Sequence, residues 1–160
     1  MDDKKCSNLY ALLKIESGTE DYRYFHEIQR ADLLRIAEND YDPSSYDAFF
    51  LVPAERHQLL LKYNRAAIGV LTFDKIDGHK AVLRGIAIKE EFRNCGHGRA
   101  LIEAARDYAA DRGVTQLCVN ANVDKTPFYR RLFFIETEWS HAEATLMSGE
   151  GAPVQMVLHL

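Results

Sequence analysis

The first half of the chain carries apolar runs of the length and composition typical of strands. The first run is Leu9–Ile15, and two more, Gln58–Tyr63 and Ala66–Phe73, lie further along the chain. Only Asn64-Arg65 separates the second run from the third. Because a two-residue connection between apolar runs favours a tight turn, we expect a β-hairpin here.

A further strand is predicted over Ala81–Ile88, after the turn signal Asp77-Gly78. Gly85 lies inside this run. A glycine in a strand interior weakens pairing, and it often marks a bulge or a place where another group approaches the backbone.

Two longer segments have helical signals. Thr19 is an expected N-cap, with acidic residues in the following turn, for a helix that extends to about Glu38. Its apolar residues form no single stripe, so we expect a break or a wide buried face. The second helix is predicted over Gly98–Arg112, where apolar residues recur on one face, and Gly113 is expected to end it.

The remaining elements are shorter. We expect a short helix near Tyr46–Phe50, a strand over Thr115–Val119, a helix over Thr126–Leu132, and two strands, Phe134–Glu138 and Pro153–His159, around a polar loop. Repeats and linkers are absent from the sequence. It therefore predicts one mixed α/β (α+β) domain over 1–160, with a mostly antiparallel first half.

Composition excludes several classes of protein. The sequence is 47% hydrophobic and 28% charged, as in ordinary globular proteins, and no apolar run is long enough to span a membrane. The net charge of −4 does not favour nucleic acid. The start has no secretory pattern, and the three cysteines fit neither a disulfide framework nor a zinc site, so we expect a cytoplasmic protein without a metal.

The segment Lys89–His97 and the residues after it carry the chemistry. Gly96 and Gly98 lie between a buried strand and the start of a long helix. Free N–H groups and the helix dipole make such a junction a site for phosphate, to which Arg93 and Arg99 could add charge. The residues fit neither a Walker A loop nor a dinucleotide fingerprint. A glycine-rich turn that binds nothing stays open.

Three motifs, in order, resemble the GNAT superfamily of N-acetyltransferases. Arg93-Asn94-Cys95-Gly96-His97-Gly98 is similar to its R-x-x-G-x-G cofactor signature, and Ile86-Ala87-Ile88 to its fourth strand. Val119-Asn120-Ala121-Asn122 and the Pro127–Phe134 segment resemble its V-N-A-x … P-F-Y-x-x-x-G-F pattern. The resemblance covers about residues 57–160.

The resemblance implies a central, mostly antiparallel sheet of about six to seven strands, splayed between the fourth and fifth, with helices on both faces. It also implies acetyl-coenzyme A as co-substrate. The acetyl group would move to a primary amine by direct attack, through a tetrahedral intermediate. Backbone amides from Asn94 to Arg99 would bind the pyrophosphate, and the pantetheine would pair with the fourth strand.

Site residues follow from the same resemblance. The N–H of Ile88 would stabilise the oxyanion, and the phenol of Tyr129 would protonate the departing thiolate. Packing of Tyr129 on its short helix is the alternative. Residues expected to contact the coenzyme are Ile86, Ala87, Ile88, Arg93, Asn94, Cys95, Gly96, His97, Gly98, Arg99, Asn120, Asn122, Phe128, Tyr129 and Arg131.

Other roles stay open. Asn120 and Asn122 could instead form a strand-end turn. His97 is expected in solvent or beside the phosphate, and Lys125 with Arg130 and Arg131 could meet the 3′-phosphate or form an exposed helix face. Candidates for the base that deprotonates the amine are Asp40, Tyr41, Asp42, Glu136, Glu138 and His141, or water alone.

Two residues depart from the family pattern. Phe133 occupies the place of a glycine that is often left-handed, and a non-glycine residue there costs on the order of 1 kcal/mol or forces another cap. Lys125 replaces a small residue. We expect a small-molecule or peptide amine as partner, neither nucleic acid nor membrane, and a homodimer through the last strands stays open. The alternative functions are a non-catalytic module that binds acyl-coenzyme A, or an enzyme with a longer acyl donor.

Overall fold

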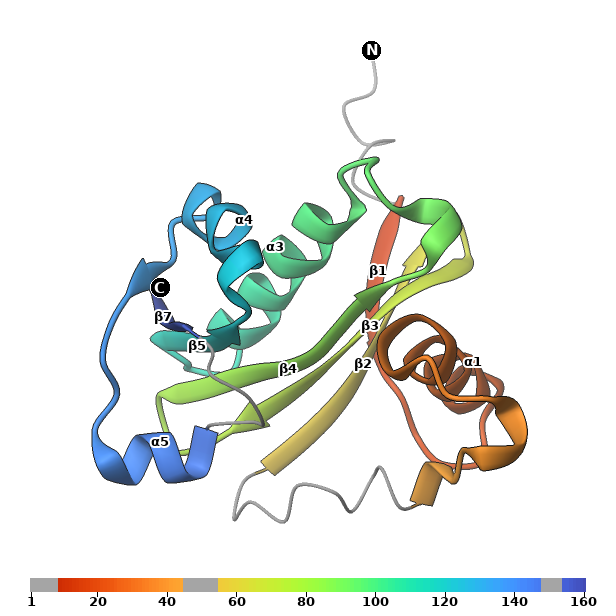
Figure 1. Ribbon diagram of the computed structural model, residues 1–160, viewed down its shortest axis with the longest axis horizontal. Coiled ribbons are helices and arrows are strands. Elements are labelled where there is room, and N and C mark those ends of the chain that lie inside the picture. The colour runs from red at the N-terminus through yellow and green to blue at the C-terminus, as the bar shows by residue number, and fades with distance from the viewer. Residues whose placement is uncertain (1–8, 45–54, 148–153) are drawn as a thin grey trace. The chain divides into compact units, whose positions relative to one another are not determined.

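The computed structural model describes residues 9–44, 55–147 and 154–160. Its strands hydrogen-bond in the order β1-β2-β3-β4-β5-β7-β6 (Figure 1). Their bounds are β1 Tyr10–Lys14, β2 Glu55–Tyr63, β3 Ala66–Lys75, β4 Lys80–Ile88, β5 Gln116–Ala121, β6 Ile135–Glu136 and β7 Val154–His159. The pairs β1–β2, β5–β7 and β6–β7 are antiparallel, whereas β4–β5 is parallel. The predicted mixed, mostly antiparallel sheet is confirmed.

Two compact units divide the chain. Among the described residues, the first contains 9–44, 57–72 and 85–105, and the second contains 55–56, 73–84, 106–147 and 154–160. The expectation of one domain over 1–160 stays a prediction.

In the first unit, α1 begins where the sequence predicts but ends earlier. Thr19 caps α1 (Glu20–Ile28), because its hydroxyl oxygen accepts a hydrogen bond from the N–H of Tyr22 at 3.2 Å. A π-helical turn, Gln29–Leu34, then replaces the expected continuation to Glu38 and ends at Arg35, where φ is 54°. The prediction of one helix to Glu38 is therefore wrong in its second half, although a break was expected.

A short 3-10 turn, Glu38–Asp40, follows the π-helical turn. The short helix predicted over 46–50 lies outside the described residues.

The hairpin between β2 and β3 is confirmed. Asn64 and Arg65 have φ values of 47° and 70°. Two successive positive φ values define a type I′ turn, whose twist matches that of the strands it joins.

Helices of the first unit cover both faces of its strands, as expected. Phe25 and Ile28 of α1 pack in one cluster with Val70 of β3. On the other face, a Cβ atom at Gly69 would lie 3.6 Å from Leu101 of α3 (His97–Ala110). Gly69 and Val70 are neighbours in one strand, so their side chains point to opposite faces. One face of β3 therefore packs on α1 and the other on α3.

Gly85 marks the irregularity predicted inside β4. Its φ is +56°, and a Cβ atom there would lie 3.4 Å from Leu33 of the π-helical turn. The glycine therefore permits both a left-handed backbone and a close approach. Gly113, with φ of +76°, follows the end of α3 as the sequence predicts.

In the second unit, the parallel register joins Lys80–Leu83 of β4 to Gln116–Val119 of β5. The register is shorter than either strand, as expected at the predicted splay. The helix α4 (Thr126–Arg131) agrees with its prediction, whereas β6 is only two residues long.

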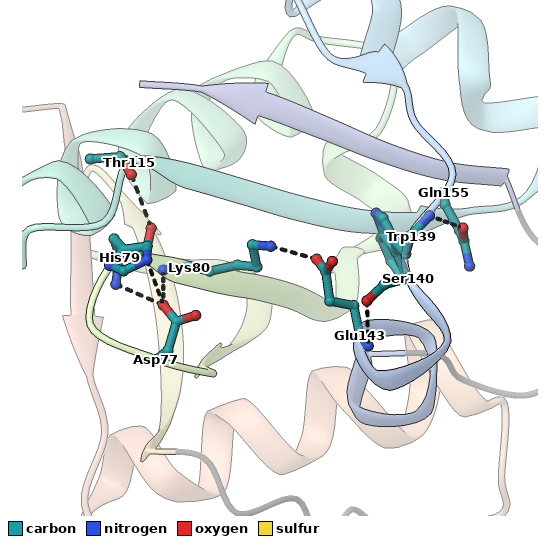
Figure 2. A network of polar contacts seen from close by, with 8 residues as sticks. All are labelled: Asp77, His79, Lys80, Thr115, Trp139, Ser140, Glu143 and Gln155. Atoms are coloured by element: carbon teal, nitrogen blue, oxygen red, sulfur yellow. Dashed lines mark hydrogen bonds and ion pairs between the residues drawn. The ribbon is translucent and has the colours of Figure 1, made fainter.

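The expected polar loop between β6 and β7 contains a helix instead, α5 (His141–Met147). The N–H of Glu143 donates to Oγ of Ser140, and the Glu143 carboxylate pairs with Lys80 of β4 (Figure 2). Trp139 packs beside this helix against Val82 and Cys118. The ion pair and the tryptophan thus fix α5 on the strands of its own unit. Local signals in the sequence do not indicate this packing.

Within the described residues, no helix has the length and apolar character needed to cross a membrane. The same residues contain no group of three or more His, Cys, Asp or Glu side chains placed to hold a metal ion.

Candidate phosphate-binding turn and catalytic residues

The turn that begins α3 has unpartnered backbone donors. The first bonded N–H of the helix is that of Ala100, which donates to the carbonyl oxygen of Gly96 at 3.1 Å. No described residue accepts a hydrogen bond from the N–H groups of Gly96, His97, Gly98 or Arg99. Four adjacent free donors at the positive end of a helix of 14 residues form an anion-binding arrangement.

Backbone conformation keeps this turn open. Gly96 has φ of +83°, and a Cβ atom built there would have no neighbour within 4 Å. Asn94, with φ of 61°, is also left-handed, and it is exposed with Cys95. Side chains therefore do not close the turn over the glycine.

Arg93 binds protein atoms rather than standing free beside the turn. Its Nε donates to the carbonyl oxygen of Ile88 at 2.9 Å, and its Nη2 donates to the carbonyl oxygen of Asp32 at 3.1 Å. The exposed Arg99 pairs with Glu103 at 2.8 Å. A direct contact of either arginine with phosphate stays a prediction.

The side chain of His97 differs from its expectation. The ring is buried, and Nδ1 lies 2.7 Å from the hydroxyl of Tyr10. The prediction of a solvent-exposed loop residue is therefore wrong, because β1 and β2 supply aromatic neighbours for this imidazole. Burial, with a smaller contribution from Tyr63, raises the pKa of Tyr10. The backbone N–H of His97 is one of the unpartnered donors of the turn.

Backbone alternation at the end of β4 places the Ile88 amide. The N–H of Lys89 donates to Ile68 of β3 at 2.8 Å. Neighbouring residues of a strand direct their N–H groups to opposite edges, so the N–H of Ile88 points away from β3. The N–H of Ile86 points in the same direction as that of Ile88, because the two residues are two positions apart in the strand. The side chain of Ala87 is buried against α1.

The second unit holds the two candidate asparagines. Oδ1 of Asn120, in β5, is buried and has no hydrogen-bond partner among the described residues. A buried acceptor without a donor is costly, so this oxygen is suited to an N–H group from a ligand. Asn122 is exposed, and its carbonyl oxygen accepts from the N–H of Lys125 at 2.8 Å, as in the turn that was the alternative.

Tyr129 lies on α4 with its ring buried between two aromatic side chains. Its centroid is 5.1 Å from that of Phe128 and 5.4 Å from that of Phe134. Burial raises the pKa of Tyr129 to about 12. No described residue hydrogen-bonds to its hydroxyl, which is also not among the enclosed polar atoms. The ring is held while the phenol keeps a transferable proton.

The basic residues of the α4 region, and Phe133 after the helix, are exposed. Arg131 and Lys125 lie in solvent, and Arg130 pairs with Glu136. Phe133 has φ of 70° and is 76% exposed. The predicted left-handed position after the helix is therefore confirmed, with a phenylalanine where glycine would be unstrained.

The structure singles out no general base. Glu136 is engaged by Arg130, and the carboxylate of Asp42 accepts from the N–H of Ser44. The hydroxyl of Tyr41 lies 2.6 Å from Nδ1 of His26. The remaining candidates, Asp40, Glu138 and His141, are exposed.

Neither described cysteine has the environment of a nucleophile. Cys95 is exposed, with Sγ 3.4 Å from the carbonyl oxygen of Arg93. Cys118 is buried, and burial raises the pKa of its thiol to about 11.

Sequence reasoning missed the side chains that support the turn from afar. Asp32 contacts the segment before the turn, and Tyr10 and Tyr63 surround His97. Asp32 is 58 residues from Glu90, and Tyr10 is 87 residues from His97. No motif in the sequence marks these pairs, because each partner appears as an ordinary helix or strand residue.

A mixed sheet with a parallel β4–β5 pair, and a turn of unpartnered N–H donors between β4 and the long helix α3, define an α+β protein with a candidate anion-binding turn. The Acetyltransferase (GNAT) family model matches residues 20–134, more than half of the chain. The chain therefore belongs to the GNAT family of acetyltransferases.

Solved structures show the same fold. A GNAT family acetyltransferase from Elizabethkingia anophelis, with acetyl-CoA bound, has a TM-score of 0.67 at 15% identity, covering 96% of this chain and 99% of that chain. The ribosomal-protein-S18-alanine N-acetyltransferase from Escherichia coli has a TM-score of 0.64 at 16% identity, covering 92% of this chain and 90% of that chain.

N-acetylglutamate synthase from Neisseria gonorrhoeae, complexed with coenzyme A and L-arginine, has a TM-score of 0.67 at 11% identity. The match covers 95% of this chain and 33% of that chain. No curated protein matches the chain in sequence.

Proposed function

We propose that this protein is an N-acetyltransferase that moves the acetyl group of acetyl-coenzyme A to a primary amine. The observation that carries the proposal is the row of free N–H groups from Gly96 to Arg99, next to the end of β4. Family membership supports the reaction class, and the bound acetyl-CoA of the Elizabethkingia anophelis protein supports the donor.

The residues present fit this coenzyme. A pyrophosphate needs several N–H donors without a Cβ atom in the way, and the open space at Gly96 supplies that. A pantetheine amide needs an acceptor, and the unpartnered Oδ1 of Asn120 is one.

Each named residue has a separate task. Acetyl-coenzyme A supplies an activated acetyl thioester. The amides of Gly96–Arg99 bind and orient the pyrophosphate. The N–H of Ile88, pointing away from β3, stabilises negative charge on the carbonyl oxygen. Tyr129 donates its phenolic proton to the leaving sulfur, since burial keeps that proton in place at neutral pH.

The acceptor must arrive as a neutral amine or lose a proton at the site. The base for this step stays among the candidates named above, or water carries the proton away. The amine is a small molecule or a peptide N-terminus.

Release of free thiol from acetyl-coenzyme A, measured against polyamines, amino acids, aminoglycosides and peptide N-termini, tests the proposal. We expect one class to accelerate release. Calorimetry with coenzyme A gives the affinity independently. Binding without transfer to any amine would favour the non-catalytic module, and absence of both would reject the assignment. Release of free thiol only from longer acyl thioesters would show that the donor is a longer acyl-coenzyme A rather than acetyl-coenzyme A.

A matched glycine pair tests the turn itself. Gly96→Ala introduces a Cβ atom at a left-handed position, and we expect coenzyme affinity to fall about tenfold. Gly78→Ala is the control, because Gly78 also has open space around it but no positive φ. Equal affinity of the two variants would remove the turn from the binding site.

A further inference from the structure

The segment between β4 and the turn of free donors is held by a side chain from a distant helical turn. The carboxylate Oδ1 of Asp32 accepts a hydrogen bond from the N–H of Glu90 at 2.9 Å. Glu90 begins the 3-10 turn Glu90–Phe92, whose own N-cap, Lys89, provides no side-chain cap. Asp32 therefore supplies the missing cap from 58 residues away.

Asp32 also holds the motif arginine. Its carbonyl oxygen accepts from Nη2 of Arg93 at 3.1 Å, and its carboxylate lies 3.6 Å from the same nitrogen. Nε of Arg93 in turn donates to the carbonyl oxygen of Ile88 at 2.9 Å. A rigid guanidinium that makes two directed contacts fixes the distance between the atoms it joins.

These contacts fix two successive peptide groups at the end of β4. The peptide of Ile88 and Lys89 is held at its carbonyl by Arg93 and at its N–H by Ile68 of β3. The next peptide is held at its N–H by Asp32. These contacts hold the segment Lys89–Arg93, which we call the clamped segment. The Ile88 amide lies before this segment, and the free donors from Gly96 onward lie after it.

The π-helical turn presents Asp32 for this purpose. Leu33, its neighbour, lies against Gly85 of β4, and the side chain of Asp32 is only 13% exposed. Irregular π-helical turns within α-helices are often found at functional sites. The turn thus contacts β4 through Leu33 and the segment after β4 through Asp32.

We propose that Asp32 is a positioning residue for coenzyme binding: it holds Glu90 and Arg93, and through them sets the donors on either side of the clamped segment. The inference rests on the proposed function for its ligand. Asp32 itself touches no reacting atom. A purely structural role would lower stability alone, whereas a positioning role changes coenzyme affinity and the local opening of the segment.

The test compares Asp32→Ala, Asp32→Asn and the control Glu27→Ala, a change of an exposed carboxylate on α1. Three measurements are made: hydrogen exchange at the Glu90 amide in the ligand-free protein, calorimetric Kd for coenzyme A, and KM and kcat for acetyl-coenzyme A. For Asp32→Ala we expect faster exchange at Glu90 and a Kd and KM raised about tenfold, with kcat changed less than about threefold.

Asp32→Asn should give an intermediate Kd, because its amide oxygen still accepts from Glu90 but has lost the charge that attracts Arg93. This variant also serves if Asp32→Ala does not fold. Glu27→Ala should resemble the wild type. In a double-mutant cycle, Asp32→Ala and Arg93→Ala should be non-additive, since both act on one segment.

Asp32 variants that bind coenzyme A as tightly as the wild type would overturn the positioning role while leaving the proposed function intact. A wild-type protein that binds no coenzyme A would overturn both. Faster exchange at Glu90 in all three variants, Glu27→Ala included, would also count against the inference, because it would show general loosening.

Discussion

The hydroxyl of Tyr10 lies 2.7 Å from Nδ1 of His97 and so joins β1 to the first residue of α3. Tyr63, the partner of Tyr10 in the β1–β2 register, has its ring centroid 4.8 Å from that of His97. Because α3 begins with the unpartnered donors, β1 helps to fix the turn that we propose to bind phosphate.

Tyr10→Phe tests this link. The variant keeps the ring packing but leaves the buried Nδ1 without its hydroxyl partner, which costs about 1 kcal/mol. We expect thermal denaturation to show a Tm lowered by about 2–4 °C, and calorimetry to show weaker coenzyme binding. The control is Tyr24→Phe, whose lost hydroxyl bond to Glu20 is exposed. Equal effects of the two changes would contradict the link.

Tyr129→Phe tests the proton donor. The ring packing with Phe128 and Phe134 is preserved, so we expect an unchanged Tm and nearly unchanged coenzyme affinity. Turnover should fall at least about tenfold, since loss of a general acid typically costs more than that. Undiminished turnover would remove Tyr129 from the mechanism.

The pH profile of the wild-type enzyme provides an independent test of Tyr129. Burial raises its pKa to about 12, so its neutral, proton-donating form persists as pH rises through 10. We expect no loss of kcat from this group below about pH 11. A fall in kcat near pH 9 that disappears in Tyr129→Phe would show that the phenol ionises much earlier.

The ion pair between Lys80 and Glu143 should stabilise the second unit within a limited range of pH (Figure 2). Their hydrogen bond raises the pKa of Lys80 above 10.5 and lowers that of Glu143 below 4.5. The stabilisation from Glu143, whose pKa is lowered, is present above pH 4.5 and is lost as the pH falls through its pKa in the folded protein. The stabilisation from Lys80, whose pKa is raised, is present below pH 10.5 and is lost as the pH rises through its pKa in the folded protein.

Glu143→Gln should therefore be less stable than the wild type mainly between these limits. We expect a difference of at most about 1 kcal/mol, because both side chains are partly in solvent. Urea denaturation at pH 3, 7 and 11 measures it. Glu138→Gln, at an exposed carboxylate of the same segment, is the control. A difference that is independent of pH would argue against the ion pair as its cause.

Phe133→Gly should stabilise the protein. Phe133 has φ of 70°, and its side chain is 76% exposed, so glycine removes backbone strain and loses little packing. The greater freedom of glycine in the unfolded chain offsets part of this gain. We expect a Tm higher by up to about 4 °C. A lower Tm would show that the exposed ring has a partner of its own.

Local signals in the sequence determined much of the fold. Thr19 caps α1, Asn64-Arg65 forms the hairpin turn, and Gly113 ends α3, as predicted. The left-handed conformation at Phe133 also follows from its place after α4. Each of these features depends on residues within one or two turns, so the sequence around it contains the physical cause.

The supporting partners of the site required the tertiary structure. Burial of His97 depends on Tyr10 and Tyr63, and the partners of Arg93 depend on a π-helical turn far away in the chain. The sequence alone determined that glycines and a helix start follow a buried strand, and therefore that an anion could bind there. Only the fold decided which side chains hold that turn, because those contacts join residues 34 to 87 positions apart, whose spacing along the chain carries no periodic signal.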